Sequence, residues 1–460
     1  MNLPPLLASP PPAGGAKYFR VPKAFWRVLL WVNVAIILWY WWQGSSTLFT
    51  AGWGSVLVAL GKLSGLLAAG SVLLQFAFMG RNPWLERSFG LDKLARIHAR
   101  SGKRSFYFLV LHPILITLGY AILSQTNVIS QFLTFWFSYP YVWWASLALI
   151  LFVVVIATSI MIVRTRLPYE AWYFVHLLVY VAVFLSLWHQ FVVGTDLLAS
   201  RVFYTYWVGI YTVVLGSHLI FRFGRPVYLF FRHQFRVSRI FRENYNTVSI
   251  YFTGKSTDQF NIYPGQFMIL RFFTKGLWWQ AHPFSLSRVP DGKEIRITAK
   301  AVGDFTQKLG SVPVGTKVLI DGPYGIFTEW TNESPKVLFI AGGIGITPIR
   351  SLMERLVSRG REAVLLYANK TEKDIVFKKE LEEVVKRYGG DIVHVLSDEP
   401  AYAGEKGFID TNKIKRLVPD VAKRDVYLCG PPPMMKAVIA ALQNLGVSAE
   451  RIHWERFALE

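Results

Sequence analysis

Hydrophobic residues follow two different patterns along this chain, long apolar runs up to about residue 231 and short alternating runs after it. Each of six long runs approaches the ~20 residues that a membrane-spanning helix needs. The expected spans are Phe25–Trp42, Val56–Met79, Ser105–Leu123, Tyr141–Val163, Ala171–Phe191 and Phe203–Phe223. The pattern therefore predicts a six-helix transmembrane bundle within residues 25–231.

Beyond this bundle, Gly, Pro, Asn and Asp separate shorter apolar runs. Runs such as TVSIYF, GQFMILRFF and EIRITAKAV predict an antiparallel β-barrel over residues 232–333. From residue 334, apolar strands such as KVLFIA and AVLLYA alternate with helical patterns, which predicts an α/β nucleotide-binding domain over residues 334–460. Residues 1–24 are rich in Pro and Gly without an apolar core, so we expect a disordered cytoplasmic tail there and no cleavable signal peptide.

The distribution of charge predicts the orientation of the spans. Lys and Arg gather before the first span, between the second and third, between the fourth and fifth, and after the sixth. The intervening loops Gln43–Ser55 and Ser124–Pro140 carry no charge. By the positive-inside rule, both termini and the two later domains are expected in the cytoplasm.

Composition changes how the strong positive charge is interpreted. A net charge of +21 would suggest nucleic-acid binding in a soluble protein. Here 53% of residues are hydrophobic, and the basic clusters lie beside apolar runs, so membrane orientation and anionic lipid explain them better. We expect an integral protein of a bacterial plasma membrane whose partner is the lipid bilayer, with no nucleic acid and no obligatory protein partner.

Four of the nine histidines lie at matched spacings in two apolar segments. His98 and His112 are fourteen residues apart in Leu91–Leu123, and His176 and His189 are thirteen apart in Glu170–Phe191. At ~1.5 Å per residue, each pair extends over roughly 20 Å of the ~30 Å hydrocarbon core. Two parallel helices of this kind could hold two stacked metal centres, one between His98 and His176 and one between His112 and His189. A flat cofactor with one axial position on each face, such as haem, needs opposed imidazoles of this kind.

The simpler alternative is that each histidine only hydrogen-bonds a neighbouring helix. That explanation suits one such residue but not four, because ionisable groups are costly to bury in a bilayer. Fourteen residues return to within ~40° of the same helix face and thirteen do not, so the fifth span must distort or the two centres must be rotated. Lys62, near the outer end of the second span, either snorkels to the interface or binds a propionate of the outer haem.

Three motifs in the later domains suit a flavin or phosphate groups, although each taken singly also suits an ordinary turn. HPFSLS, which begins at His282, can place a Phe and a Ser beside a flavin ring. KAVGDFTQKL puts Gly303 at a turn and Thr306 near a helix start, where backbone N–H groups favour phosphate. GGIGITP, which begins at Gly342, follows a strand and opens a helix, as dinucleotide-binding turns do.

The single cysteine, Cys429, excludes an intrachain disulfide framework and a cysteine-based zinc or iron–sulfur site. It ends a predicted strand in CGPPPMM, at the carboxyl edge of the sheet where ligands bind in such folds. The alternative is a small buried residue. Phe457, in the closing WERFALE, is either a core aromatic or a plate over a ring.

Together these segments resemble the transmembrane ferric reductase and NADPH oxidase family over nearly the whole chain. The matching elements are the four histidines, RLPYEAWYFVH, HPFSLS, DGPYG, GGIGITP, CGPP and ERF. The resemblance implies a multi-domain protein with six helices and two bis-histidine b-type haems. A β-barrel FAD domain and an α/β NAD(P)-binding domain, similar to those of ferredoxin–NADP reductase, would follow.

The resemblance also implies site residues, motif by motif. The haem ligands would be His98, His112, His176 and His189. The FAD would be lined by His282, Pro283, Phe284 and Ser285, and its pyrophosphate would meet Lys300, Gly303 and Thr306. The coenzyme phosphates would be held by Gly342, Gly343, Gly345 and Thr347, with Cys429, Gly430 and Pro431 at the nicotinamide. Phe457 would cover the flavin, and the expected catalytic residues are Cys429 and Phe457.

The implied activity is electron transfer from cytoplasmic NAD(P)H through FAD and two haems to an acceptor outside. Short, almost uncharged outer loops favour dioxygen, giving superoxide, over a ferric chelate. A haem-free membrane-anchored flavin reductase and a non-enzymatic electron-transfer or interaction protein stay open as alternatives. After the strand LLYAN, Lys370 and Lys373 suit a 2′-phosphate, which favours NADPH with NADH accepted, unless this is only a solvated charged loop.

Overall fold

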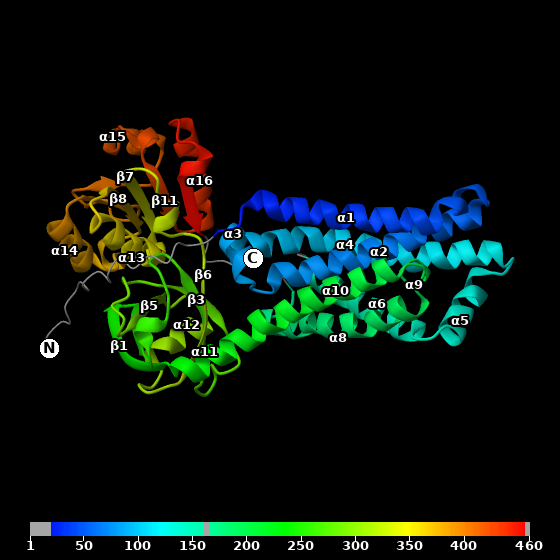
Figure 1. Ribbon diagram of the computed structural model, residues 1–460. Helices are drawn as coiled ribbons and strands as arrows, with labels where there is room; N and C mark the ends of the chain where they lie inside the picture. The colour runs from blue at the N-terminus through cyan, green and yellow to red at the C-terminus, as the bar shows by residue number, and fades with distance from the viewer. Residues whose placement is uncertain (1–19, 161–165, 456–460) are drawn as a thin grey trace. The chain divides into compact units, whose positions relative to one another are not determined.

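The computed structural model describes residues 20–160 and 166–455, which form two compact units (Figure 1). The helical unit comprises Val21–Asn82 and Lys93–Arg222. The sheet unit comprises Arg20, Pro83–Asp92 and the chain from Phe223 onward. Most of the predicted tail, residues 1–19, lies outside the described chain, and the first helix begins at Lys23.

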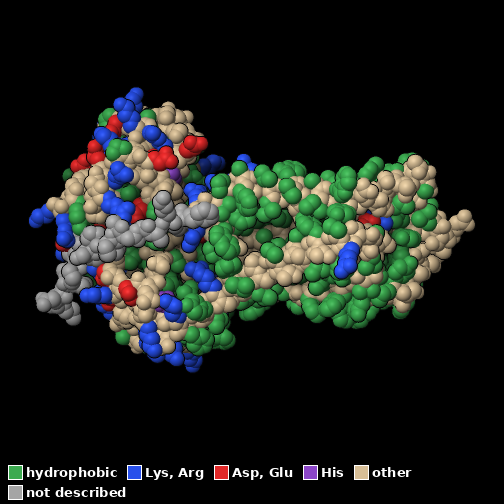
Figure 2. All heavy atoms as spheres, viewed as in Figure 1, with side chains coloured by type: hydrophobic (Ala, Val, Ile, Leu, Met, Phe, Trp, Pro, Cys, Tyr) green, Lys and Arg blue, Asp and Glu red, His purple; other side chains and the backbone are tan. Residues whose placement is uncertain are grey.

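Six helices in the described part of the chain are long and apolar enough to cross a membrane. They are α1 Lys23–Ser45, α2 Trp53–Met79, α4 Leu91–Leu123, α6 Val142–Ser159, α8 Tyr169–Val193 and α10 Arg201–His218. The apolar helical stretch that begins with α10 runs on to His233 and so includes α11 Arg225–His233. Hydrophobic side chains cover most of the visible face of the helical unit, and Lys and Arg gather on the sheet unit (Figure 2). The six predicted spans are therefore present. Because α4 begins well before Ser105, the expected start of the third span, His98 and His112 share one continuous helix.

The uncharged loop Ser124–Pro140 contains a helix that was not predicted, α5 Val128–Ser138. Asn127 caps it, because its side-chain oxygen accepts the backbone N–H of Ser130 at 2.8 Å. An apolar run of this length is too short to span a membrane, and its pattern alone does not separate a helix from a loop. A further short helix, α9 Thr195–Leu198, precedes α10.

The first part of the sheet unit is the predicted antiparallel barrel, built from two three-stranded sheets in the orders β1-β2-β5 and β4-β3-β6. Its strands are β1 Arg236–Asn244, β2 Thr247–Thr253, β3 Phe267–Phe272, β4 His282–Ser285, β5 Ile295–Lys300 and β6 Val318–Tyr324. The sequence suggests a connection between strands at HPFSLS, but its first four residues form β4. The helix α12 Asp304–Lys308 follows β5.

The second part is a six-stranded parallel sheet in the order β10-β9-β8-β7-β11-β12. Its strands are β7 Lys336–Gly342, β8 Glu362–Asn369, β9 Asp391–Leu396, β10 Glu405–Lys406, β11 Asp425–Cys429 and β12 Ile452–Glu455. Its helices are α13 Ile346–Val357, α14 Lys378–Tyr388, α15 Thr411–Leu417 and α16 Pro432–Asn444. Leu352 of α13 and Leu381 of α14 join one hydrophobic core, and Ile414 of α15 and Val438 of α16 join another. Helices therefore cover both faces of the sheet, as parallel sheets require.

Two more helices of the sheet unit come from chain next to the spans. The helix α3 (Pro83–Phe89) lies between the second and third spans, and Leu91 just after it packs with Phe267 and Tyr324 of the barrel. The helix α11 (Arg225–His233) continues from α10 through the π-helical segment Leu219–Gly224. The helical unit therefore ends at Arg222, before the boundary expected at residue 231, because α11 packs on β6 of the barrel.

Candidate functional site

Two pairs of histidines face each other between α4 and α8. The ring centroids of His98 and His176 are 6.0 Å apart, and those of His112 and His189 are 6.5 Å apart. The ring planes differ by 73° in the first pair and by 39° in the second. The structure thus brings together the same pairs that the sequence spacing predicted.

These separations suit a metal ion held between the two rings. Two imidazole nitrogens at about 2.0 Å from a shared ion place the ring centroids about 6.3 Å apart. Each pair supplies two ligands, and the described residues contain no cluster of three or more His, Cys, Asp and Glu that could hold a metal. A haem iron needs only two protein ligands, because the porphyrin supplies the other four. The four histidines therefore fit two haems, and their ligation stays a prediction.

Hydrogen bonds determine the tautomer of one histidine in each pair. The Nδ1–H of His112 donates to the carbonyl of Gly61 at 2.8 Å, since a carbonyl only accepts. Ser159 donates its hydroxyl hydrogen to the carbonyl of Val155, so its oxygen accepts the Nδ1–H of His176 at 3.3 Å. Both rings then keep Nε2 as the nitrogen with a free lone pair, the arrangement found in metal-binding histidines.

Gly61 and Gly65 of α2 leave room for His112 and Ile116 of α4. A Cβ added at Gly65 would lie 2.5 Å from Nδ1 of His112, and one at Gly61 would lie 2.8 Å from the side chain of Ile116. Neither glycine was predicted as a site residue. The signal was present, however, because Gly61 and Gly65 have the G-x-x-x-G spacing of closely packed membrane helices.

Lys62, next to Gly61, has a protein partner. Its Nζ lies 3.1 Å from Oδ1 of Asp196 on α9, and the two side chains are only 18% and 6% exposed. The sequence predicted either snorkelling or a haem propionate for this lysine, and did not predict the ion pair. A role of Lys62 in propionate binding stays a prediction.

The two predicted flavin motifs meet in the barrel. His282 on β4 lies against Phe305 of α12 with ring centroids 4.0 Å apart, and Phe284 lies 6.2 Å from the same ring. HPFSLS and KAVGDFTQKL therefore border one region. In the second motif, the hydroxyl of Thr306 accepts the backbone N–H of Gly303 at 3.1 Å, which holds the turn closed.

The remaining predicted flavin residues lie on β4 and β5. Pro283 pairs with Ile269 within the sheet, and Lys300 at the end of β5 forms an ion pair with Asp374 at 3.7 Å. The hydroxyl of Ser285 is buried and has no hydrogen-bond partner in the described chain. Because unsatisfied buried hydroxyls are uncommon, a bound group with polar atoms would suit this position. The barrel thus fits a flavin, and each of these contacts with it stays a prediction.

Two glycine turns meet at the carboxyl edge of the parallel sheet. The neighbouring strands β7 and β11 end at Gly342 and Cys429. A Cβ at Gly345 would meet the carbonyl oxygen of Cys429, and one at Gly430 would lie 3.1 Å from the backbone nitrogen of Gly342. Gly343 has φ +53°, which favours glycine. GGIGITP and CGPP therefore form one candidate site, at the strand ends where ligands bind in such sheets.

The other predicted coenzyme residues surround this edge. The hydroxyl of Thr347 donates to the carbonyl of Ile344 at 3.1 Å. Pro431 precedes the first turn of α16. Lys370 directly follows β8, and its side chain is exposed. These positions are compatible with coenzyme binding, which stays a prediction for each residue.

A buried thiol and a buried carboxyl end the adjacent strands β11 and β12. Burial raises the pKa of the Cys429 thiol, and Glu455 raises it further. Burial also raises the pKa of Glu455, with a smaller effect from Asp92 and Glu86, and its Oε2 has no hydrogen-bond partner in the described chain. Cys429 is therefore a neutral thiol near neutral pH, which suits contact with a ring better than nucleophilic attack. Phe457 lies outside the described residues.

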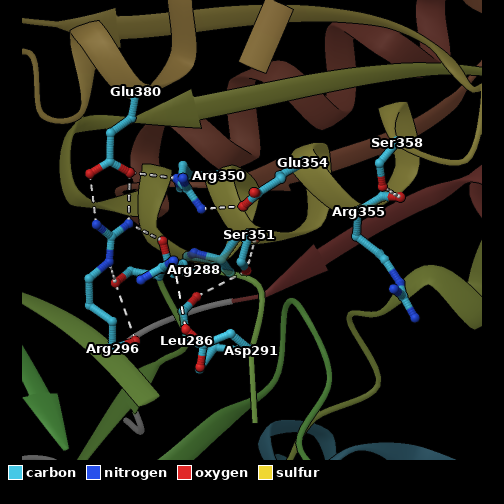
Figure 3. A network of polar contacts seen from close by, with 12 residues as sticks. Leu286, Arg288, Asp291, Arg296, Arg350, Ser351, Glu354, Arg355, Ser358 and Glu380 are labelled. Carbon is cyan, nitrogen blue, oxygen red and sulfur yellow. Dashed lines mark hydrogen bonds and ion pairs between the residues drawn. The ribbon is translucent and has the colours of Figure 1, made fainter. Parts of the chain in front are cut away.

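An ion-pair network joins the barrel to the parallel-sheet domain (Figure 3). Arg296 on β5 donates to both carboxylate oxygens of Glu380 on α14, at 2.7 and 3.0 Å. Glu380 also pairs with Arg350 of α13 at 2.9 Å, and Arg350 donates to Glu354. Arg296 further donates to the carbonyl of Ser287, the last residue of HPFSLS, at 2.6 Å. No sequence pattern predicts this network, because its members are scattered along the chain and none belongs to a recognisable motif.

Three family models match consecutive parts of the chain. The ferric reductase like transmembrane component matches residues 64–187, the FAD-binding domain matches residues 232–328, and the oxidoreductase NAD-binding domain matches residues 339–439. The transmembrane match includes His98, His112 and His176 and ends two residues before His189.

Curated relatives match about half of the chain. The glycine betaine monooxygenase reductase subunit of Pseudomonas aeruginosa is 28% identical over 235 residues, which are 49% of this chain and 64% of the relative. The stachydrine N-demethylase reductase subunit of Rhizobium meliloti is 30% identical over 227 residues, 47% of this chain and 64% of the relative. The NADPH oxidoreductase of Mycobacterium tuberculosis is 26% identical over 238 residues, which are 49% of this chain and 60% of the relative. The chain thus covers less than two thirds of the length of these relatives.

Solved structures match a similar share of the chain. The FAD/NAD-binding domain of nitric oxide dioxygenase from Vibrio cholerae is 26% identical, with 48% of this chain and 98% of that one covered and a TM-score of 0.44. A ferredoxin NADP+ reductase from Neisseria gonorrhoeae with bound FAD and NADP is 15% identical. The match covers 49% of this chain and 99% of that one, with a TM-score of 0.43.

Proposed function

Because the chain has the domain architecture of the transmembrane ferric reductase and NADPH oxidase family, we propose that it moves electrons from cytoplasmic NADPH across the membrane to an outside acceptor. The three family models support a membrane oxidoreductase with FAD- and NAD-binding domains. When bound, FAD would take two electrons as a hydride and release them singly, and two b-type haems would carry single electrons. The residues of the chain bind, orient and shield these groups.

The observation that carries this proposal is the pairing of four histidines on α4 and α8. Ring separations of 6.0 and 6.5 Å leave room for one metal ion in each pair. His98 and His112 are fourteen residues apart on α4, so the two centres would be roughly 20 Å apart along the helix. Stacked centres of this kind would carry charge across most of the apolar core, which a single centre could not do.

The charges next to the spans support cytoplasmic placement of the sheet unit. Basic residues lie on the segments that join the second and third spans and the sixth span and barrel, whereas the loop between the third and fourth spans has no charge. The positive-inside rule then puts the coenzyme site on the side that holds NADPH. The inner pair, His98 with His176, would lie on this side, and His112 with His189 on the outside.

The structure supports dioxygen as the acceptor in one respect. The outer half of the helical unit holds Asp196, but this carboxylate is paired with Lys62. The described residues hold no cluster of carboxylates, histidines or cysteines to bind a hard ferric ion. Dioxygen is neutral and needs only access to the outer centre, so we propose superoxide as the product, with ferric-chelate reduction as the second candidate.

The decisive experiment supplies NADPH to the purified protein after loading with haem and saturation with FAD. Dismutase-sensitive reduction of cytochrome c is measured in air, and ferric-chelate reduction is measured under argon. Superoxide formation at twice the molar rate of NADPH consumption is the expected result, because each hydride supplies two electrons and each dioxygen takes one. Iron reduction at the full rate without a dismutase-sensitive signal would replace dioxygen with a ferric complex and leave the electron route intact.

A second measurement separates the haem route from a haem-free flavin reductase. The reduced-minus-oxidised spectrum of the wild-type protein should show b-type haem, and His112→Ala should lose the outer haem while NADPH-to-dye activity survives. A wild-type protein without a haem spectrum would overturn the proposed electron route. A protein that binds no flavin would indicate a non-enzymatic role.

A further inference from the structure

The outward side of α11 is apolar. This helix is the last part of the apolar stretch Arg201–His233, and it belongs to the sheet unit. Its inner side buries Pro226 and His233 against the barrel. On its outer side, Val227, Tyr228 and Phe231 are 50%, 56% and 68% exposed. A surface helix of a soluble domain normally turns polar residues outward. An aromatic outer side therefore indicates a partner that is itself partly apolar.

A second segment extends this apolar surface. Phe273, at the start of the connection between β3 and β4, is 43% exposed, and its ring centroid lies 5.3 Å from that of Phe230 on α11. Two segments more than forty residues apart in sequence thus contribute to one patch. We call Val227, Tyr228, Phe231 and Phe273 the aromatic face.

Positive charge surrounds the aromatic face. The segments 225–237, 271–280 and 313–317 contain no Asp or Glu. Their Lys and Arg residues are Arg225, Arg232, Arg236, Arg271, Lys275 and Lys317. Arg232 holds its guanidinium over the ring of Tyr228 and donates to the phenol oxygen at 2.6 Å, which places a cation directly on the aromatic face.

Chain connectivity keeps this surface near the bilayer. Only Leu219–Gly224, a π-helical segment, separates the end of α10 from the start of α11. Even fully extended, six residues reach roughly 20 Å. Aromatic rings with flanking cations are the side chains that favour the headgroup region, and anionic lipid attracts each nearby Lys or Arg.

We propose that the aromatic face, with its surrounding cations, is a docking surface for anionic phospholipid of the leaflet on the side of the sheet unit. The ring side chains enter the headgroup region, and Arg232, Lys275 and their neighbours contact lipid phosphate. This contact restrains the barrel beside the membrane in addition to the covalent link from α10. It does not depend on which acceptor the protein reduces or on whether haem is bound.

The test uses the full-length protein in vesicles of phosphatidylcholine with phosphatidylglycerol. Phe231→Cys is spin-labelled, and the buried Cys429 can stay in place because it is inaccessible to the reagent. Phe408→Cys is the matched control, since Phe408 is a 79% exposed phenylalanine on the same unit, outside the three segments. Collisions of the label with dioxygen, which concentrates in lipid, and with a charged nickel chelate, which stays in water, are compared.

The ratio of oxygen to nickel collisions at position 231 should exceed that at 408 by about tenfold, because lipid excludes the charged chelate. Val227→Cys should behave as position 231 does, which gives a second reading if Phe231→Cys does not fold. In phosphatidylcholine alone, or with Arg232→Gln and Lys275→Gln together, the ratio at 231 should fall towards that at 408. Equal ratios at 231 and 408 in the anionic vesicles would overturn the proposal. A short spin–spin distance between two labelled chains would overturn it in favour of a second copy.

Discussion

The guanidinium of Arg296 and the carboxylate of Glu380 face each other as a bidentate pair, with N···O distances of 2.7 and 3.0 Å. Arg296 belongs to the flavin-type barrel and Glu380 to the coenzyme-type domain, and their side chains are 2% and 12% exposed. Burial disfavours both charges, but the pair and Arg350 outweigh it, so the pKa of Glu380 lies below its ordinary value and that of Arg296 lies above. The pair therefore stays ionised at neutral pH and fixes one domain against the other.

Arg296→Met should destabilise the sheet unit by about 3–5 kcal/mol, because it leaves a buried carboxylate with one fewer partner. Thermal release of bound flavin measures the loss. Arg416→Met is the matched control, since Arg416 pairs with Glu405 at the surface with 60% of its side chain exposed. This change should have little effect on stability, because solvent screens an exposed ion pair. Equal losses in the two variants would show that the Arg296–Glu380 pair does not hold the domains together.

Gly65→Val should remove the outer haem. The added side chain would collide with His112, since even a Cβ at this position would lie 2.5 Å from its Nδ1. The reduced-minus-oxidised spectrum should lose the contribution of one of the two haems, and NADPH-to-dye activity should persist. Gly209→Val on α10 is the control, because nothing lies within 4 Å of a Cβ there. A full haem spectrum in Gly65→Val would argue against His112 as a ligand.

Glu86→Gln should reduce the pH dependence of stability. Burial raises the pKa of Glu86 to about 7 from 4.5, although its carboxylate accepts the N–H of Gly325 at 2.7 Å. The folded state therefore binds more protons than the unfolded state between pH 4.5 and about 7, so stability falls as pH rises through this window. The loss from Glu86 alone amounts to about 3 kcal/mol above pH 7.

The glutamine amide keeps an oxygen for the Gly325 N–H but cannot ionise. The melting temperature of Glu86→Gln at pH 8 should therefore exceed that of the wild type, with little difference at pH 4.5. Glu382→Gln, at an exposed position of α14, should follow the wild type at both values. If the melting temperature of Glu86→Gln depended on pH as that of the wild type does, Glu86 would not be the group that titrates.

Lys370→Glu should raise the KM for NADPH by about tenfold or more, because a charge-assisted hydrogen bond to the 2′-phosphate is replaced by repulsion. The KM for NADH, which lacks this phosphate, should change little. Lys386→Glu, an exposed lysine near the end of α14, serves as the control and should affect neither coenzyme. Equal effects of Lys370→Glu on both coenzymes would remove the argument for NADPH.

Much of this molecule follows from local pattern. Apolar runs long enough to span a bilayer marked all six helices, because the length and hydropathy of a run are properties of contiguous residues. Spacing along two helices was enough to predict that His98 would face His176 and His112 would face His189. The switch to short alternating runs located the barrel, and strand–turn–helix patterns located the glycine turns after β7 and β11.

The two histidine pairs apart, only the tertiary structure revealed the contacts between distant segments named here. Gly65 is a site neighbour because α2 crosses α4 at His112, and Glu86 meets Gly325 from 239 residues away. Arg296 and Glu380 belong to different domains, and Lys62 forms an ion pair with Asp196. Such pairs have no sequence period, since a side chain's partner is chosen by packing across elements and not by its neighbours in the chain. Local pattern therefore determined the elements and the spacing of the four histidines, and three-dimensional packing decided which charges and glycines those elements bring together.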